Sequence, residues 1–69
     1  MNLVNTCPDI PDSWEGGISD AAVILGLHRD TIAKKAKLGR RYGGIDWRPG
    51  KRGKIFTGKE IKRFWRTYR

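Results

Sequence analysis

The residues best suited to chemistry in this chain are closely spaced cations. Lys34, Lys35 and Lys37 fall within four positions, and Arg40 and Arg41 follow soon after them. Lysine and arginine side chains can neutralise the phosphates of a nucleic-acid backbone, and both can donate hydrogen bonds to the acceptor atoms of guanine. This spacing predicts a surface that binds a polyanion, with double-stranded DNA as the expected partner.

Acidic residues are separated from basic ones along the chain. Residues 1–17 contain Asp9, Asp12 and Glu15 but no Lys or Arg. The remaining residues hold all fifteen cations and only four acids, and the formal net charge of the whole chain is +8. Such a density of like charge costs self-repulsion, which a polyanionic partner would relieve. A basic surface that only keeps the protein in solution is the alternative.

The side chains that enzymes use are scarce here. His28 and Cys7 are the single histidine and the single cysteine, so the sequence offers neither a set of zinc ligands nor a disulfide framework. It contains no glycine loop of the G-x-x-x-x-G-K type and no carboxylate pair suited to acid–base catalysis. A chain of this size buries only about 60% of its unfolded surface, which leaves little room for an enclosed active site. We therefore expect no enzyme activity, cofactor, metal site or small-molecule substrate.

The apolar residues are too dispersed for a membrane span. No segment approaches the roughly 20 consecutive apolar residues that such a helix needs, and the first residues have neither the basic start nor the apolar stretch of a secretion signal. A single cysteine is compatible with a reducing compartment. We expect a cytoplasmic protein that has no membrane partner.

Two short helices joined by a tight turn are expected to carry the cations. The first should begin at Ser19 as its cap, with Ile18 and Val23 at the positions of a hydrophobic staple, and should end at Gly26. The second should run from about His28 to Leu38, with Leu27, Ile32 and Ala36 on its buried side and Leu38 as a further candidate for that side. Its outer faces then carry the candidate DNA-reading residues, which are Arg29, Asp30, Thr31, Lys34, Lys35 and Lys37. An ordinary solvated helix face is the alternative for this set.

A β-hairpin with a basic tip is expected next. Residues 45–48 and 54–57 read as short extended runs that flank a turn at residues 49–53, which is rich in glycine and cations. Trp47 and either Ile55 or Phe56 should face inward and fasten the hairpin to the helices. The candidate wing and backbone contacts to DNA are Arg40, Arg41, Arg48, Lys51, Arg52 and Lys54.

A third helix should close the core. Thr57 and Glu60 have the spacing of a capping box, in which each side chain accepts a hydrogen bond from a backbone N–H at the helix start. Ile61, Phe64, Trp65 and Tyr68 recur at helical spacing and should form the buried stripe. Lys59, Lys62, Arg63, Arg66 and Arg69 should lie outside. Stacking of the helix aromatics on nucleic-acid bases is the alternative to their burial.

Residues 1–17 show neither the helical nor the alternating spacing of apolar residues, and they contain Pro8, Pro11, Gly16 and Gly17. These features predict an extended acidic arm. Trp14 should pack back onto the helices. The predicted organisation is this arm followed by one DNA-binding domain over residues 18–69.

The run Ala21-Ala22-Val23-Ile24-Leu25-Gly26-Leu27-His28-Arg29-Asp30-Thr31-Ile32 resembles the "AA-x-x-L-G-V-S-x-x-T-I" run of small winged helix-turn-helix proteins of the excisionase and MerR-like group. The likeness of element order extends from Ile18 to about Tyr68. His28 departs from the pattern, because Ser or Thr is the usual cap at that position. The resemblance implies a mostly α fold with a small β-hairpin: a winged helix-turn-helix of three helices and a basic wing.

The resemblance also implies a division of labour. The second helix would enter the major groove, where Asp30, Thr31 and Lys34 match the positions that excisionases use near base edges. The wing-tip cations would reach phosphates or the adjacent minor groove. Excisionases are architectural factors of mobile elements that assist a recombinase, so an integrase or recombinase and further copies of this chain are possible partners. A small transcriptional regulator with the same fold and an RNA-binding module are the alternatives.

Overall fold

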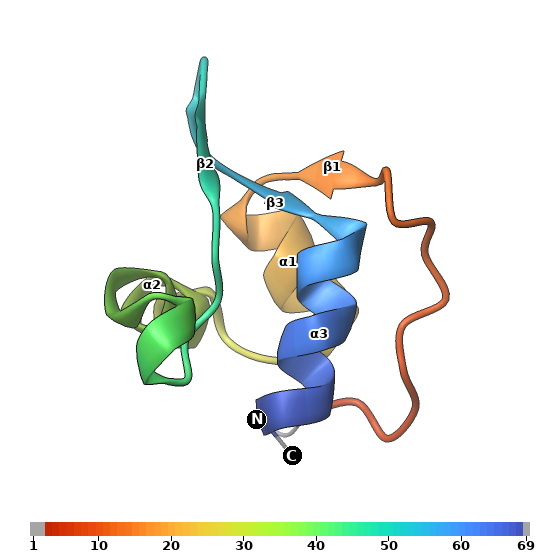
Figure 1. Cartoon of the computed structure of the whole chain (residues 1–69). Helices are drawn as coiled ribbons and strands as arrows, with labels where there is room; N and C mark the ends of the chain where they lie inside the picture. Colours follow the sequence, from red (N-terminus) through yellow and green to blue (C-terminus); the bar gives the residue numbers. More distant parts are fainter. Residues whose placement is uncertain (1–2, 69) are drawn as a thin grey trace.

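The computed structural model describes residues 3–68. Along the chain its elements are β1 (Glu15–Gly16), α1 (Ile18–Leu25), α2 (Arg29–Leu38), the 3-10 turn η1 (Arg40–Tyr42), β2 (Arg48–Gly50), β3 (Gly53–Thr57) and α3 (Gly58–Tyr68). The described residues thus form three α-helices and a three-stranded antiparallel sheet with strand order β1-β3-β2. Figure 1 shows the sheet lying across one end of α1 and α3, with α2 to one side. The three predicted helices and the predicted hairpin are present, and β1 makes the architecture mixed α/β.

The turn between α1 and α2 is only three residues long. Gly26 adopts a left-handed backbone with φ 74°, and its N–H bonds to carbonyls of the last turn of α1. The prediction that α1 ends at this glycine is confirmed, because an L side chain at this φ would be strained. His28 then caps α2, since its Nδ1 accepts a hydrogen bond of 3.1 Å from the backbone N–H of Asp30.

The predicted start of α1 was wrong in two details. Gly17 is the N-cap and makes no side-chain hydrogen bond there, whereas Ser19 lies within the first turn. Val23 is 79% exposed, so it forms no staple with Ile18. The prediction of Ser19 as the N-cap failed because serine and glycine are both favoured at N-caps, so local preference alone does not choose between Ser19 and Gly17.

The hairpin is shifted toward its tip relative to the prediction. Strand β2 begins at Arg48, so residues 45–47 are not strand, and Gly50 pairs with Gly53 across a two-residue loop. That loop is Lys51-Arg52, and the strands therefore include most of the segment predicted as a turn. A two-residue loop is the tightest common hairpin connection. A Cβ at Gly50 would overlap the side chain of Ile55, and Gly53 has a φ of 127° that favours glycine.

The N-terminal segment runs along the helices and then joins the sheet. Glu15 and Gly16 of β1 pair with Thr57 and Phe56 of β3, a strand that the sequence did not predict. The backbone N–H of Val4 donates to the carbonyl of Leu25 over 2.9 Å. Trp14 is half-buried against the core, as predicted.

Helix α3 begins where three of its first N–H groups find acceptors outside the helix. Gly58 donates to the carbonyl of Trp14 over 2.7 Å, Lys59 to the carbonyl of Asp12 over 3.3 Å, and Glu60 to the hydroxyl of Thr57 over 3.3 Å. The Thr57 half of the predicted capping box is confirmed. The other half is wrong, because the Glu60 carboxylate instead pairs with Arg63 and accepts the N–H of Asp46.

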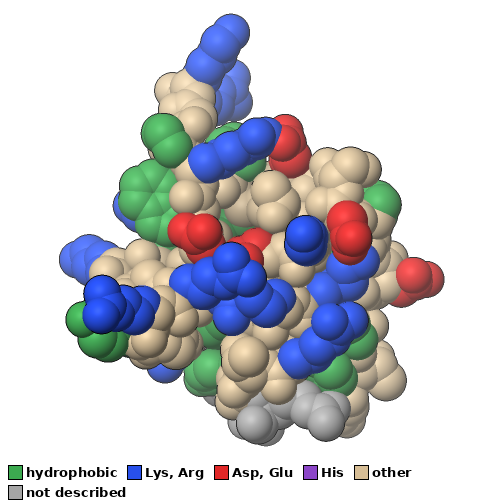
Figure 2. All heavy atoms as spheres, in the orientation of Figure 1, with side chains coloured by type: hydrophobic (Ala, Val, Ile, Leu, Met, Phe, Trp, Pro, Cys, Tyr) green, Lys and Arg blue, Asp and Glu red, His purple; other side chains and the backbone are tan. Residues whose placement is uncertain are grey.

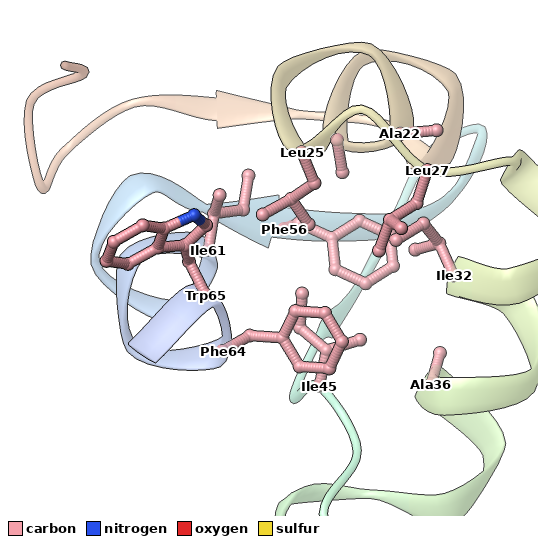
Figure 3. Packing of buried hydrophobic residues seen from close by; sticks show 11 residues of the cluster. Ala22, Leu25, Leu27, Ile32, Ala36, Ile45, Phe56, Ile61, Phe64 and Trp65 are labelled. Atoms are coloured by element: carbon pink, nitrogen blue, oxygen red, sulfur yellow. The ribbon is translucent and has the colours of Figure 1, made fainter. Parts of the chain in front are cut away.

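A small core joins all three helices and β3. Figure 3 shows these side chains converging from different elements. The buried apolar residues are Ala21, Ala22, Leu25, Leu27, Ile32, Ala36, Ile45, Phe56, Ile61, Phe64 and Trp65. This confirms the predicted inner side of α2, apart from the exposed Leu38, and, for α3, Ile61, Phe64 and Trp65 but not Tyr68. Phe56 rather than Ile55 is the inward residue of the hairpin. Tyr68 is 38% exposed and stacks on Phe64 at a ring-centroid distance of 5.1 Å. None of the helices within residues 3–68 is long and apolar enough to cross a membrane.

Candidate nucleic-acid interface

The outer side of α2 presents more cations than acids. Asp30, Lys34 and Lys37 are exposed and follow one another at intervals of four and three residues, which places them on one side of the helix. Arg29 is exposed as well, and Thr31 is half-buried. We call these five residues the α2 face. Within the described part of the chain, Lys34 and Lys37 form no ion pair.

Lys35 does not lie on that face. Its side chain is half-buried, and its Nζ lies 5.2 Å from the centroid of the Tyr68 ring of α3. A cation over an aromatic face is attracted to the ring. The predicted outer position of Lys35 is therefore wrong, because three- and four-residue spacing turns this lysine toward α3.

The turn η1 folds back on the end of α2. The carbonyl of Lys35 accepts hydrogen bonds from the N–H groups of Gly39 and Ile45, each over 3.2 Å. Arg40 and Arg41 are exposed on this turn, and the Arg41 guanidinium lies over the ring of Tyr42 at 5.9 Å. The sequence thus placed both arginines correctly at the exit of α2, but it gave no sign of the 3-10 turn that presents them.

The tip of the hairpin is the most projecting part of the molecule. Figure 1 shows the β2–β3 hairpin extending beyond the helices. Lys51 and Arg52 form its two-residue loop, and both are exposed. Neither forms an ion pair with any residue in the range 3–68. We call these two residues the wing tip.

The other two predicted wing cations are held at the base of the hairpin. Arg48 forms an ion pair with Glu15 of β1, and Lys54 lies over the ring of Trp47 with its Nζ 4.8 Å from the ring centroid. Both are exposed. Their charges are partly engaged within the protein, so they are less free than the wing tip to contact a partner.

Trp47 ties the hairpin to α2. Its indole N–H donates to the carbonyl of Ala36 over 3.2 Å, while 39% of the residue stays exposed. The predicted fastening role agrees with this hydrogen bond, but the ring is not fully turned inward. Because of this link, α2 and the hairpin lie on the same side of the molecule, whereas the N-terminal segment runs along the opposite side (Figure 1).

Acids of the N-terminal segment offset cations away from the α2 face. Asp12 pairs with Lys62 of α3 and Glu15 with Arg48. The hydrogen bond and the charge of Lys62 hold the pKa of Asp12 below its ordinary value. The positive charge on the α2 face and the wing tip is left largely uncompensated, with Asp30 as the acid on that face.

Tyr42 was not singled out from the sequence. It is 70% exposed, next to two arginines at the exit of α2. An exposed aromatic ring beside guanidinium groups can stack on a base or a sugar. The sequence could have indicated this exposed ring, because Tyr42 lies between two arginines and two glycines. No helical or strand pattern in that segment requires a buried aromatic residue.

Comparison of the chain with protein-family models, with curated proteins and with solved structures gives no match. Within residues 3–68, no three His, Cys, Asp or Glu side chains lie close enough together to hold a metal ion.

Proposed function

We propose that this protein is a small winged helix-turn-helix protein that binds double-stranded DNA. Helix α2 enters the major groove through the α2 face, and the wing tip contacts phosphates or the adjacent minor groove. The observation that carries the proposal is the pairing of two uncompensated basic features on one side of the molecule. One is a helix of ten residues, and the other is a projecting hairpin whose loop is Lys51-Arg52.

The short turn at Gly26 supports the proposal. Helix α1 packs against α2 and buries its own Ala21, Ala22 and Leu25 in the core, so α2 is held on a packed support with its outer side free. A recognition helix needs such support, because its first residues must meet base edges in a fixed register. Asp30 can accept from cytosine and Lys34 can donate to guanine, while the wing tip offers charge without base selectivity.

For the biological role, we propose an architectural factor like the excisionases, which bends DNA and assists a recombinase of a mobile element or prophage. One module of this size is expected to bury only about 600–1,000 Å² on DNA, so neighbouring copies would be needed for high specificity. A transcriptional regulator built on the same fold is the second candidate, because the α2 face and the wing tip serve either role equally well.

The test of binding is a salt titration with a fluorescent duplex followed by anisotropy. If around five phosphates are neutralised, log K should fall against log salt with a slope of about −4 to −5. A flat response between about 50 and 200 mM salt would contradict the proposal. Competition with structured RNA measures the remaining alternative: stronger displacement by RNA than by duplex DNA would favour an RNA-binding module.

The role is tested by circular-permutation gel shifts on the attachment region beside a neighbouring integrase gene. An architectural factor should bend this DNA and bind it in several adjacent copies. Binding of a single copy to unbent DNA, or tight binding at a promoter instead, would favour the transcriptional regulator.

A further inference from the structure

A second basic surface lies on α3 and η1, apart from the α2 face and the wing tip. We call it the α3 surface and define it by Arg40, Lys59, Lys62, Arg63 and Arg66. Figure 2 shows Lys and Arg side chains gathered over α3, well separated from those at the end of the hairpin. Arg40, Lys59 and Arg66 are exposed. None of these three forms an ion pair within the described residues.

A hollow of about 310 Å³ opens at this surface. Its lining residues are Arg40, Thr57, Lys59, Glu60, Arg63 and Arg66. Glu60 is the single acid among them, and its carboxylate is engaged by Arg63 and by the N–H of Asp46. Arg63 also donates to the carbonyl of Gly44 over 3.0 Å, which fixes the pair in place. The charges of the three unpaired cations around the hollow are therefore not offset by this acid.

The chemistry of the lining favours phosphate groups over a protein partner. No large apolar or aromatic side chain lines the hollow, whereas protein interfaces are anchored by such groups at their centres. Binding to a phosphate backbone needs only positive charge and hydrogen-bond donors, which arginine and lysine supply. The first N–H groups of α3 are already bonded to Trp14, Asp12 and Thr57, so the side chains alone supply the donors.

We propose that the α3 surface binds the phosphate backbone of a second DNA duplex while the α2 face and the wing tip hold the first. The proposal rests on the function proposed above. In the view of Figure 2 the α3 surface faces the reader, whereas α2 and the hairpin extend to its left and above it. The two surfaces face different directions on a body of 31 × 24 × 20 Å. A duplex of about one helical turn is far shorter than the persistence length of DNA, roughly 150 base pairs, so it stays nearly straight and cannot meet both. One protein molecule would thus bridge two DNA segments without a second copy.

The experiment counts duplexes per protein by native mass spectrometry at low ionic strength. The probe is an excess of a duplex of about one helical turn, roughly 10–12 base pairs, which is too short to hold two distant contacts. The wild-type protein should form complexes of one protein with two duplexes. Lys59→Gln/Arg66→Gln should bind one duplex only, while anisotropy shows its affinity for a single duplex unchanged within about twofold.

A second variant removes charge from the other site. Lys34→Gln/Lys37→Gln/Lys51→Gln/Arg52→Gln should also bind one duplex, through the α3 surface, and these substitutions combined with Lys59→Gln/Arg66→Gln should bind none. Arg40→Gln supplies an independent variant of the α3 surface and should lower the fraction of two-duplex complexes. Circular dichroism on each variant checks that the fold is kept.

Several results would overturn the bridging proposal. Wild-type complexes that contain one duplex only, or two proteins with two duplexes, would do so while leaving DNA binding intact. Persistence of two-duplex complexes in Lys59→Gln/Arg66→Gln would place the second duplex elsewhere. If the wild-type protein bound one duplex and also a poly-glutamate peptide that this variant fails to bind, the α3 surface would serve an acidic protein instead. Failure to bind any duplex would refute the proposed function as well.

Discussion

The indole N–H of Trp65 donates a hydrogen bond of 2.8 Å to the backbone carbonyl of Val4. This contact joins the last helix to the N-terminal segment, and the carbonyl of Leu25 in α1 binds the N–H of the same valine. Val4 is therefore held from both sides by helices that pack into the core. The N-terminal segment acts as part of the folded unit at this point, although no periodic pattern in its sequence predicts packing.

Trp65→Ala should lower the free energy of unfolding by about 3–5 kcal/mol, because a large ring that is 7% exposed leaves a cavity. Trp65→Phe keeps most of the apolar contact but leaves the Val4 carbonyl without its donor, which should cost about 1–3 kcal/mol. Urea denaturation followed by circular dichroism measures both. Native stability of Trp65→Ala would contradict the buried position of this ring.

Trp47 provides the comparison for that experiment. It is 39% exposed and contributes one hydrogen bond to α2, so Trp47→Ala should cost clearly less than Trp65→Ala, about 1–2 kcal/mol. An equal loss in the two variants would show that the base of the hairpin is as important to the core as α3.

Gly44→Ala should destabilise the protein severely. A Cβ at this buried position would overlap the Lys35 carbonyl oxygen and lie 2.6 Å from the Gly39 carbonyl oxygen, and both obstacles are backbone that cannot rotate away. Gly39→Ala is the matched control in the same segment. A Cβ there meets nothing within 4 Å, and only its φ of +75° is unfavourable, which should cost about 1–2 kcal/mol. Thermal melts should rank Gly44→Ala well below Gly39→Ala, and the reverse order would contradict this account of η1.

The ion pair of Asp12 with Lys62 should make stability depend on pH in the acidic range. The Lys62 hydrogen bond and charge, with further help from Lys59 and Arg66, hold the folded-state pKa of Asp12 below its ordinary value of 3.8. A carboxyl with a lowered folded pKa stabilises the fold above its ordinary value, and this contribution disappears as the pH falls through the folded pKa. Melting temperatures of the wild-type protein and Asp12→Asn should therefore differ at neutral pH and converge below pH 3.8.

Asp9→Asn is the control for this measurement, because Asp9 is exposed and forms no ion pair within the described residues. Asp9→Asn should have the same melting temperature as the wild-type protein at every pH. A constant gap between the wild-type protein and Asp12→Asn down to the lowest pH would show that the variant acts through something other than its charge.

Substitutions in the α2 face and in the wing tip should affect DNA binding differently, because the first is expected to read bases and the second to contact the backbone. Lys34→Ala should weaken binding to the preferred site by about 1–3 kcal/mol and relax preference at one base pair, whereas Lys51→Ala/Arg52→Ala should weaken binding to all duplexes alike. Anisotropy titrations on the preferred site and on a scrambled duplex measure the difference. Equal losses on both duplexes for Lys34→Ala would mean that the α2 face contacts only the backbone.

The helices were predictable because their signals are local. Gly26 ends α1, Thr57 caps α3, and the inner positions of α2 recur at helical spacing, so neighbouring residues are enough to place these elements. The order of helices and hairpin follows from the same signals, together with the glycines of the hairpin.

The contacts that sequence reasoning missed depend on residues far apart in the chain. Strand β1 exists because Glu15 meets Thr57, and Glu60 leaves the capping box because Arg63 and Asp46 compete for its carboxylate. Among the candidate site residues, the identity of the cations was readable, but not which of them are engaged inside the protein. Arg48 and Lys35 illustrate this, since their partners Glu15 and Tyr68 come from other elements.

The hairpin loop has a consequence for how this protein could diversify. Lys51 and Arg52 are exposed at a tight turn and make no hydrogen bond or ion pair with the rest of the described chain. Substitutions at these two positions should therefore change the free energy of unfolding very little. Selection on them would then act through binding to the partner alone. Laboratory evolution could randomise this dipeptide to retune affinity while leaving the scaffold unchanged.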